Sequence, residues 1–509
     1  MSAVASELGT IAFFVVVGWA GLWPLRHRLG PFAYHGAALP VGLLAASLAG
    51  AVSTVTGGPL DTLSAAAGGL LLIAGVWAVQ RFVVTPGDSR DAHSGEPAVG
   101  PRSFAVAAGV LAVLGTIVAL ARLTVSNNDS LVSYWPLGVE LSRKGAFSAG
   151  LMGSRSPLLP SMNAIHATFG SDWAYAIYPL FGATVLFWLV TTLWFGPLAR
   201  SSKKAKVLVT GGAAAFLVLE PSFIFQSFFV HSHMVSAMYL LLSLTCLWAA
   251  APKGEWPQDA GSRDAYLILA GLFASGLALG RPDGLAYQFV PVAVAISVLT
   301  ISSVRWRSVL AYFGPLLYVV VGSYAAAYAK LGVWAHSKLS GRATLAILFV
   351  LALSAAGPWI VQTVDRLLPF RVSGERFLGI IVATATVLML GVLALKWETA
   401  RVALATARIN LFQGAGGYHY LWYAVVLVLG LSIVTGDALA TRSWTRSPFL
   451  SVALFFVIAA VIHGLSHAGR VGVGDSFNRV AFHALPVIVW YVAAVSARIL
   501  GQTEGAEQP

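Results

Sequence analysis

Residues 103–124 read SFAVAAGVLAVLGTIVALARLT, and this stretch decides the class of fold. Its only charged residue is Arg122, close to its end. A helix needs about 20 apolar residues to cross the hydrocarbon core of a bilayer. The stretch is therefore predicted to be a transmembrane helix, and other segments along the chain have the same character. The fifteen predicted spans are 8–25, 35–56, 60–82, 103–124, 173–196, 205–221, 233–251, 265–280, 284–303, 308–330, 343–362, 377–396, 418–435, 448–464 and 481–500.

The composition of the 509 residues agrees with this prediction. Hydrophobic residues make up 58% of the chain and charged residues only 10%, whereas a soluble domain carries about 25% charged residues. The mean hydropathy is +0.79. We therefore expect an all-α polytopic membrane protein with about 15 transmembrane helices. The net charge is +12, but the sequence has no dense basic stretch of the kind that follows nucleic-acid phosphates, which excludes a nucleic-acid partner.

The predicted organisation has four parts. A three-helix unit covers 1–82, and a polar linker rich in Pro and Gly covers 83–102. The transmembrane body covers 103–500, and the tail 501–509 is expected to be disordered. The single Cys246 excludes a disulfide framework and a cysteine-based metal site.

The orientation follows from the basic residues of the loops. With the N-terminus outside, 19 Lys and Arg residues lie inside and 13 outside, as the positive-inside rule requires. The bias is weakest near Lys396 and Arg401. We expect an integral protein of the plasma (inner) membrane, and its largest outer loop is predicted at 125–172.

Asp129 is the candidate catalytic residue of this large outer loop. It directly follows the fourth predicted span, together with Asn127, Asn128 and Ser130. A carboxylate within about 3 Å of a sugar hydroxyl can accept its proton. The alternative is a cap at a helix end, a role for which Asn and Asp are both well suited.

The rest of the loop carries Tyr134, Trp135, Glu140, Arg155 and His166. Its apolar residues are spaced to form one face. That spacing predicts short amphipathic helices lying on the membrane surface.

Three further outer segments carry unusual polar residues. His231 and His233 can bind a metal ion or a phosphate group. The turn 281–284 holds Arg281 and Asp283, which are costly at membrane depth unless they are paired or functional. Its alternative role is a local ion pair that stabilises a tight turn.

The last outer segment, 465–483, is interpreted as an anion site because Arg binds phosphate bidentately; the alternative is interfacial anchoring. Its candidate residues are Arg470, Asp475, Arg479 and His483. The segment 397–417 is predicted to be a loop, and its glycines at 414–417 follow no predicted strand, so they do not support a nucleotide-binding loop.

Together these features resemble the GT-C superfamily of integral-membrane glycosyltransferases. The resemblance covers roughly 103–500. It rests on Asn127 to Pro136, then Gly145-Ala146-Phe147 and Pro157 to Pro160, on Arg281-Pro282-Asp283-Gly284, and on Gly474-Asp475-Ser476 with Arg479 and His483. The resemblance implies a polyprenyl-phosphate-linked sugar as donor, a glycan, lipid or protein as acceptor, and an inverting transfer on the extracytoplasmic face. Asp129 would be the general base, and Arg479, Arg470 and Arg281 would hold the lipid phosphate.

The first loop departs from the family pattern, because many members have two acidic residues close together there. This chain offers Asp129 alone, so Mg²⁺ or Mn²⁺ is not expected in that loop unless Glu140, His231, His233 or Asp283 completes the site.

Three other functions stay open. A transporter or flippase of a lipid-linked sugar would place charges near the bilayer midplane, often in two repeated halves. A polysaccharide ligase or polymerase would rely on Arg and His in a large outer loop without an essential acid. A non-catalytic scaffold is the third. Membrane lipid is an expected partner in every case.

Overall fold

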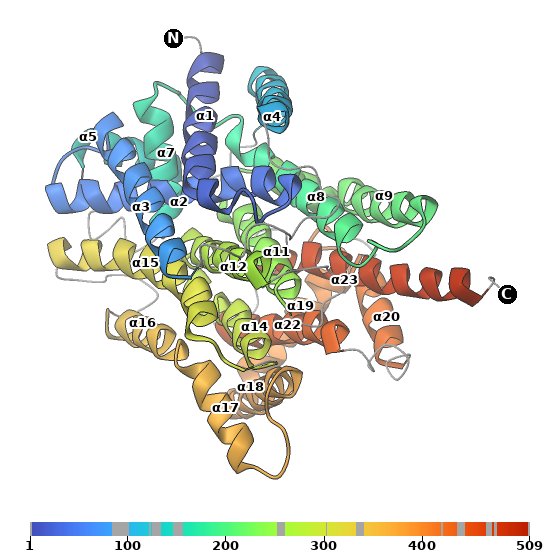
Figure 1. The fold of residues 1–509 in the computed structure, drawn as a ribbon. Coiled ribbons are helices and arrows are strands. Elements are labelled where there is room, and N and C mark those ends of the chain that lie inside the picture. The colour runs from blue at the N-terminus through green and yellow to red at the C-terminus, as the bar shows by residue number, and fades with distance from the viewer. Residues whose placement is uncertain are drawn as a thin grey trace.

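The computed structural model describes residues 3–83, 101–121, 124, 134–145, 156–251, 260–301, 303–331, 341–418, 421–434, 443–464, 471–472 and 476–506. The regular elements in these ranges are helices (Figure 1), which confirms the prediction of an all-α polytopic membrane protein. Ten helices of the described chain are long and apolar enough to cross a membrane. They are α1 (Ala3–Leu22), α2 (Pro31–Thr56), α3 (Thr62–Val83), α4 (Pro101–Ala121), α8 (Ile177–Phe195), α11 (Ser232–Ala249), α12 (Ala260–Gly280), α15 (Trp306–Leu331), α18 (Glu375–Leu395) and α23 (Ser476–Ala506).

Two of the other five predicted spans are bent pairs of helices. The helices α9 (Lys203–Leu219) and α10 (Pro221–Phe228) meet at 70°, and α16 (Gly341–Ser354) and α17 (Gly357–Leu367) meet at 58°. The described helices therefore give up to twelve spans if each bent pair counts as one. Pro221 ends α9 because proline lacks the N–H group that would continue the helix, whereas hydropathy alone reads straight through the bend.

The last three predicted spans are short helices. They are α13 (Gly284–Tyr287) with α14 (Phe289–Thr300), α20 (Leu421–Val434) and α22 (Ser443–Ala459), which is followed by the π-helix η3 (Ala460–Gly464). At 1.5 Å per residue, a helix of 14 residues such as α20 reaches about 21 Å, less than the roughly 30 Å of a hydrocarbon core. Every predicted span thus corresponds to a helix, but fifteen full spans are not present among the described residues.

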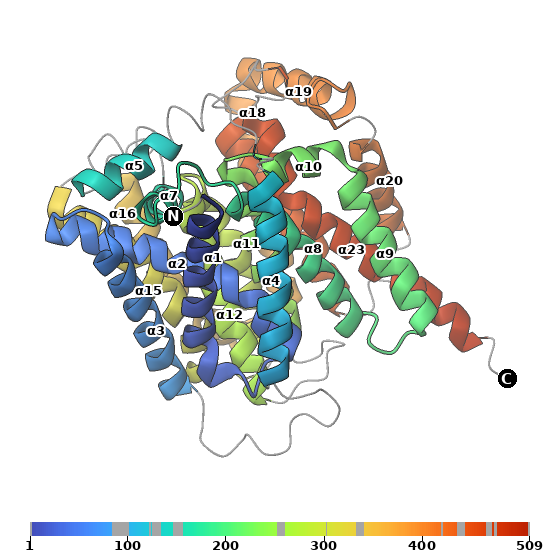
Figure 2. The ribbon, with the colours of Figure 1, turned by 90° about the horizontal axis from the view of Figure 1, so that it is seen from above.

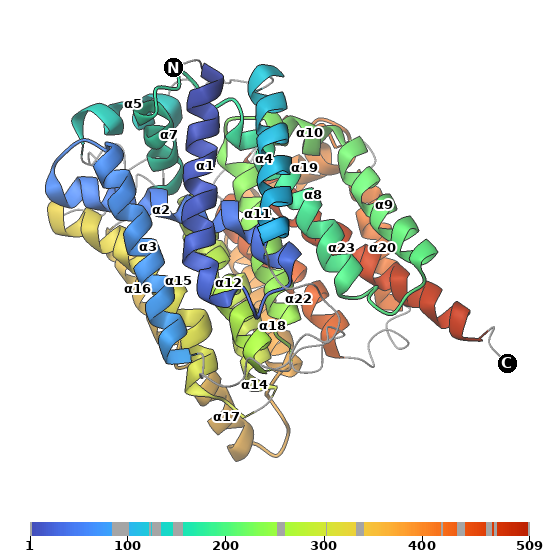
Figure 3. The same cartoon turned by 45° about the horizontal axis from the view of Figure 1, so that its top comes forward.

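Shorter helices gather at one end of the bundle. Figure 2 shows α5 (Trp135–Lys144), α10 and α19 (Trp397–Phe412) across the upper ends of the long helices, with α7 (Leu158–Thr168) beneath α5. The N-terminal end of α1 points the same way (Figure 3). The helices α5 and α7 confirm that the loop predicted at 125–172 contains short helices. The prediction that they lie on the membrane surface is wrong for α7, because its residues from Leu158 to His166 are all buried inside the protein. The segment 397–417 was predicted to be a loop, and that prediction is wrong for α19, whose exposed Glu398 and Arg401 pair at 3.1 Å.

The C-terminal tail also differs from its prediction. The helix α23 continues as far as Ala506, so residues 501–506 are helical where disorder was expected. Residues 507–509 lie outside the described residues, as does most of the predicted linker 83–102.

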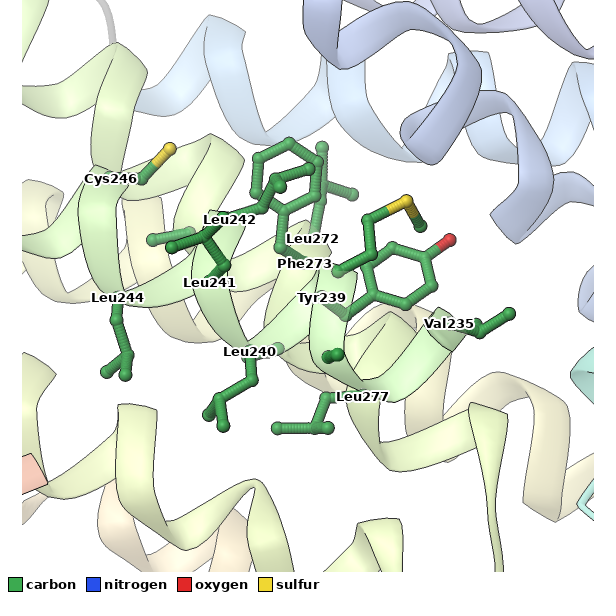
Figure 4. Packing of buried hydrophobic residues seen from close by; sticks show 14 of the residues in the cluster. Val235, Tyr239, Leu240, Leu241, Leu242, Leu244, Cys246, Leu272, Phe273 and Leu277 are labelled. Atoms are coloured by element: carbon green, nitrogen blue, oxygen red, sulfur yellow. The ribbon is translucent and has the colours of Figure 1, made fainter. Parts of the chain in front are cut away.

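The centre of the molecule is α11, whose side chains are buried along its whole length. A helix that is hydrophobic on all sides is a helix enclosed by others. Figure 4 shows Val235, Tyr239 and Leu242 of α11 packed with Leu272 and Phe273 of α12. The Tyr239 hydroxyl donates to the carbonyl of Pro40 at 2.8 Å, which ties α11 to α2.

The first three helices pack on the rest of the bundle. The helices α1 and α2 are in close contact at Gly42, where an added Cβ would lie 1.7 Å from the carbonyl oxygen of Phe14. The buried Glu7 of α1 lies 3.3 Å from Nδ1 of His166 on α7 and accepts the N–H of Ala176 at 3.0 Å. The division into an N-terminal unit and a body stays a prediction.

Candidate functional site

The candidate site begins at the first turn of α11. His231 is the N-cap residue with extended backbone, and Ser232 is the first helical residue. The rings of His231 and His233 stack with centroids 4.3 Å apart and planes 4° from parallel. Phe229 stacks on the other face of His231 at 5.6 Å. Both imidazoles are almost fully buried, so this end of α11 carries polar groups inside the protein.

Arg281 reaches this stack from the turn between α12 and α13. Its Nε donates to Oδ1 of Asp283 at 2.8 Å. Its Nη1 donates to the ring of His233, lying 2.9 Å from Nδ1 and 3.0 Å from Nε2. The same nitrogen lies 3.3 Å from the Ser232 hydroxyl. One planar guanidinium therefore joins α11 to the turn, which the separate donors of its fork make possible.

The turn needs a glycine at position 284. A Cβ there would lie 2.1 Å from the carbonyl oxygen of Leu277 in the preceding helix, and a backbone atom cannot give way easily. The close approach of the two segments directs Arg281 toward α11. The local pair of Arg281 with Asp283, which was the alternative reading of the sequence, is therefore present, and it also forms part of a larger group.

The third component comes from α23. Nε2 of His483 lies 2.9 Å from Nδ1 of His233, and His483 is fully buried. Arg479 lies four residues earlier on the same helix and therefore on the same face. Its charge is close enough to act on His233.

Tyr134, at the start of α5, joins the first outer loop to these residues. Its hydroxyl donates to the Ser232 hydroxyl at 3.2 Å, and its ring meets that of His231 edge to face at 5.1 Å. Its carbonyl accepts a hydrogen bond from Asn163 of α7 at 3.0 Å. Sequence reasoning placed Tyr134 on an apolar face and missed this role, as it did for Ser232. A general rule could have indicated the role of Tyr134, because the hydroxyl of a buried tyrosine usually forms a hydrogen bond.

We call these residues the His–Arg cluster. Its members are Tyr134, His231, Ser232, His233, Arg281, Asp283, Arg479 and His483. The cluster brings together His231, His233, Arg281, Asp283, Arg479 and His483, which the sequence analysis identified in three separate segments. It contains two arginines and one carboxylate, so its formal charge is positive. Burial lowers the pKa of Arg281, but the Asp283 carboxylate together with Tyr134 and Tyr287 outweighs burial and holds this pKa above its usual value.

The remaining candidate residues lie elsewhere or are not described. Glu140 is on α5, where it is partly exposed and pairs with Lys144 at 3.5 Å. Asn128, Asp129, Arg155, Arg470 and Asp475 lie outside the described residues. In the part of the chain that is described, no three His, Cys, Asp or Glu side chains are arranged to hold a metal ion.

The glycine-rich segment 414–417 makes turns after α19. Gly414 and Gly417 have φ values of 83° and 80°, which favour glycine. The carbonyl of Gly417 accepts a hydrogen bond from the Ser222 hydroxyl of α10 at 3.2 Å. The segment therefore braces the neighbouring α10.

No protein-family model, curated protein or solved structure matches the chain.

Proposed function

We propose that this chain is a GT-C-like membrane glycosyltransferase. It transfers a sugar from a polyprenyl-phosphate donor to a glycan, lipid or protein acceptor on the extracytoplasmic face of the plasma membrane. The observation that carries the proposal is the His–Arg cluster, in which four segments far apart in sequence meet at one end of the bundle and two of them contribute the partly buried Arg281 and Arg479. Arg281, a partly buried arginine held by hydrogen bonds, with Arg479 on the facing helix α23, suits the phosphate of a lipid-linked sugar.

In this proposal, the arginines bind the leaving phosphate. Arg281 is held by Asp283 and His233, so its position is set before any ligand arrives. With Arg479 it stabilises the negative charge that grows on the phosphate oxygen as the bond to the sugar breaks. The products are polyprenyl phosphate and the glycosylated acceptor.

Asp129 is the proposed general base. It accepts the proton of the acceptor hydroxyl while that oxygen forms its bond to the anomeric carbon, and the configuration inverts. Four residues lie between Asp129 and Tyr134, so the two Cα atoms are five extended steps apart, at most about 18 Å. Because Tyr134 is anchored to Ser232, the covalent chain keeps Asp129 within that distance of the Tyr134 Cα atom.

The test is a transfer assay on the purified protein with a panel of polyprenyl-phosphate sugars, with and without EDTA. We expect Asp129→Asn to fold and to bind the lipid donor but to lose transfer by about 100-fold or more, the usual contribution of a general base. The matched control is Asp61→Asn, because Asp61 is an exposed acid on the loop before α3 and its role as helix cap suits Asn equally well. Wild-type protein that transfers no sugar of the panel contradicts the donor class, and full activity of Asp129→Asn removes Asp129 from the chemistry.

A second candidate is a ligase or polymerase of lipid-linked polysaccharide. The observation that favours it is the composition of the cluster, in which Arg and His dominate and the Asp283 carboxylate is engaged by Arg281. Asp129→Asn and a further variant, His483→Gln, separate the two functions. A ligase loses activity in His483→Gln and retains it in Asp129→Asn, whereas the proposed glycosyltransferase loses activity in Asp129→Asn.

A further inference from the structure

A groove lies on the outside of the bundle between α2, α4 and α8. Its volume is about 520 Å³. Apolar side chains line most of it, among them Phe32, Leu39, Val110, Leu114 and Phe187. Its outer wall is α4, of which only 11% is buried inside the protein. A membrane helix with so little protein contact faces lipid, so the groove is open to the hydrocarbon core.

One end of the groove is polar and basic. Arg102 and Ser103 of α4 lie there beside His35 of α2, whose Nε2 is 3.1 Å from the Ser103 hydroxyl. The helices α2 and α4 begin at Pro31 and Pro101, and the groove residues Pro31 and Arg102 show that both N-termini are at this end. Helix N-termini carry partial positive charge and attract anions, and here a guanidinium adds a full charge.

The polar end is at the opposite end of the bundle from the His–Arg cluster. Arg102 is in the first turn of α4, and the chain beyond the other end of this helix leads to Tyr134 of the cluster. Arg81, in the last turn of α3, is at the same end as Arg102, because α3 follows α2 after the short turn 57–61 and runs back toward the end where α2 begins. A ligand whose anionic group lies beside Arg102 is therefore different from one whose phosphate lies in the cluster.

The length of the groove suits one leaflet of a bilayer. Leu114 is twelve positions after Arg102, which at 1.5 Å per residue is about 18 Å along α4. Half of a typical hydrocarbon core is about 15 Å thick. A chain that lies in the groove with its polar group at Arg102 thus extends from the headgroup level to about the bilayer midplane.

We propose that this groove binds one molecule of an anionic phospholipid. Its acyl chain lies between α2, α4 and α8, and its phosphate binds Arg102, Ser103 and the two helix N-termini. The basic end favours an anionic headgroup over a zwitterionic one, and the apolar walls require an acyl chain, so free phosphate is not the ligand. The site does not depend on the glycosyltransferase proposal.

The test is native mass spectrometry of the full chain in detergent, titrated with phosphatidylglycerol or with phosphatidylcholine of the same acyl chains. We expect one phosphatidylglycerol to bind more tightly than phosphatidylcholine. Arg102→Gln should weaken phosphatidylglycerol about fivefold, since one arginine near a membrane surface contributes about 1 kcal/mol with anionic lipid. Ala107→Trp fills the groove and should abolish the bound lipid in both titrations. Arg81→Gln is the matched control, because Arg81 is exposed at the same end but does not line the groove.

Any of three results overturns the proposal. Equal affinity for the two lipids, or an Arg102→Gln variant that binds as the wild type does, excludes the anionic headgroup. Displacement of phosphatidylglycerol by equimolar polyprenyl phosphate shows instead that the groove belongs to a lipid carrier. Thermal unfolding of each variant establishes that it is folded, and Ala107→Trp and Arg102→Gln act on different parts of the ligand, so one remains informative if the other is unstable.

Discussion

Arg281 joins the turn at 281–284 to the first turn of α11 through separate atoms of one side chain. Nε binds Asp283 while Nη1 binds His233 and lies near Ser232. A lysine keeps the charge but has a single nitrogen, which cannot occupy both places. We expect Arg281→Lys to lower the transfer rate by about tenfold or more, because a lost charged hydrogen bond costs about 1.5–3 kcal/mol.

The rate of Arg281→Lys is measured in the same assay as Asp129→Asn. Its control is Arg307→Lys, since Arg307 is exposed at the start of α15 beside Trp306. A rate within twofold of wild type for Arg281→Lys contradicts the positioning role of the guanidinium.

Glu7 is a second residue whose contacts predict a measurable effect. Its carboxylate lies against His166 and accepts the N–H of Ala176, and both side chains are buried. Glu7→Ala leaves these groups without their partner. We expect it to destabilise the protein by about 3 kcal/mol, as the loss of one member of a buried pair does.

Thermal unfolding in detergent measures the loss in Glu7→Ala. Glu398→Ala removes an exposed partner of Arg401 and should change stability by less than about 1 kcal/mol. Equal shifts in the two variants would show that the pair between α1 and α7 contributes no more than a surface pair.

The sequence predicts the members of the site better than it predicts their geometry. Charged residues are scarce in this chain, so Arg281, Asp283, Arg479 and the histidines could be recognised as candidates. Polar side chains at membrane depth are costly unless they are paired or functional. The sequence did not predict that His483 lies next to His233, which is 250 positions away, since local spacing carries no information about which helix ends meet. Tyr134 was missed because its hydroxyl shows its role only once Ser232 lies beside it.

At the level of elements, the turn between α12 and α13 depends on one glycine. The predicted Cβ contact of Gly284 with the backbone of Leu277 leaves no space for a side chain. We expect Gly284→Ala to displace the turn and to lower both the unfolding temperature and the transfer rate. Gly391→Ala on α18 is the control, because a Cβ there meets nothing within 4 Å.

Circular dichroism during heating and the transfer assay measure these two effects. A Gly284→Ala variant with wild-type stability and rate would show that the turn accommodates a methyl group. Gly391→Ala is expected to raise the stability instead, because alanine favours a helix over glycine by about 1 kcal/mol.

Hydropathy locates helices well and their ends poorly. The long helices α3, α4 and α18 were predicted nearly in full, because each is a continuous apolar run. The bend between α9 and α10 was missed, since Pro221 lies among apolar residues that extend the run. The helix α19 was read as a loop because its charged residues lower the hydropathy, although a helix that lies across the bundle needs only one apolar face.

At the level of the whole molecule, the arrangement predicts which residues share a side of the membrane. Lys144 on α5 and Arg401 on α19 belong to the end with the cluster, and both are exposed. Arg305 directly precedes α15 and Arg81 is in the last turn of α3. Both lie at the end of the bundle opposite the cluster. The single Cys246 is buried, so a cysteine introduced at each position is the accessible thiol.

Labelling with a membrane-impermeant maleimide tests this arrangement in intact cells. We expect Lys144→Cys and Arg401→Cys to react from outside, while Arg81→Cys and Arg305→Cys react only after the membrane is opened, as the positive-inside rule predicts. Equal reaction of Lys144→Cys and Arg305→Cys in intact cells would contradict the topology.

The complete enclosure of α11 has a mechanical consequence. The two histidines and Ser232 sit on the first turn of a helix that is surrounded by neighbours along its full length, with Tyr239 fastened to α2. A shift of this helix would require the whole bundle to repack, and close-packed interiors resist that. The imidazoles are therefore held in fixed positions by α11. A ligand that reaches them meets groups already in place, and little of its binding free energy is spent on ordering the receptor.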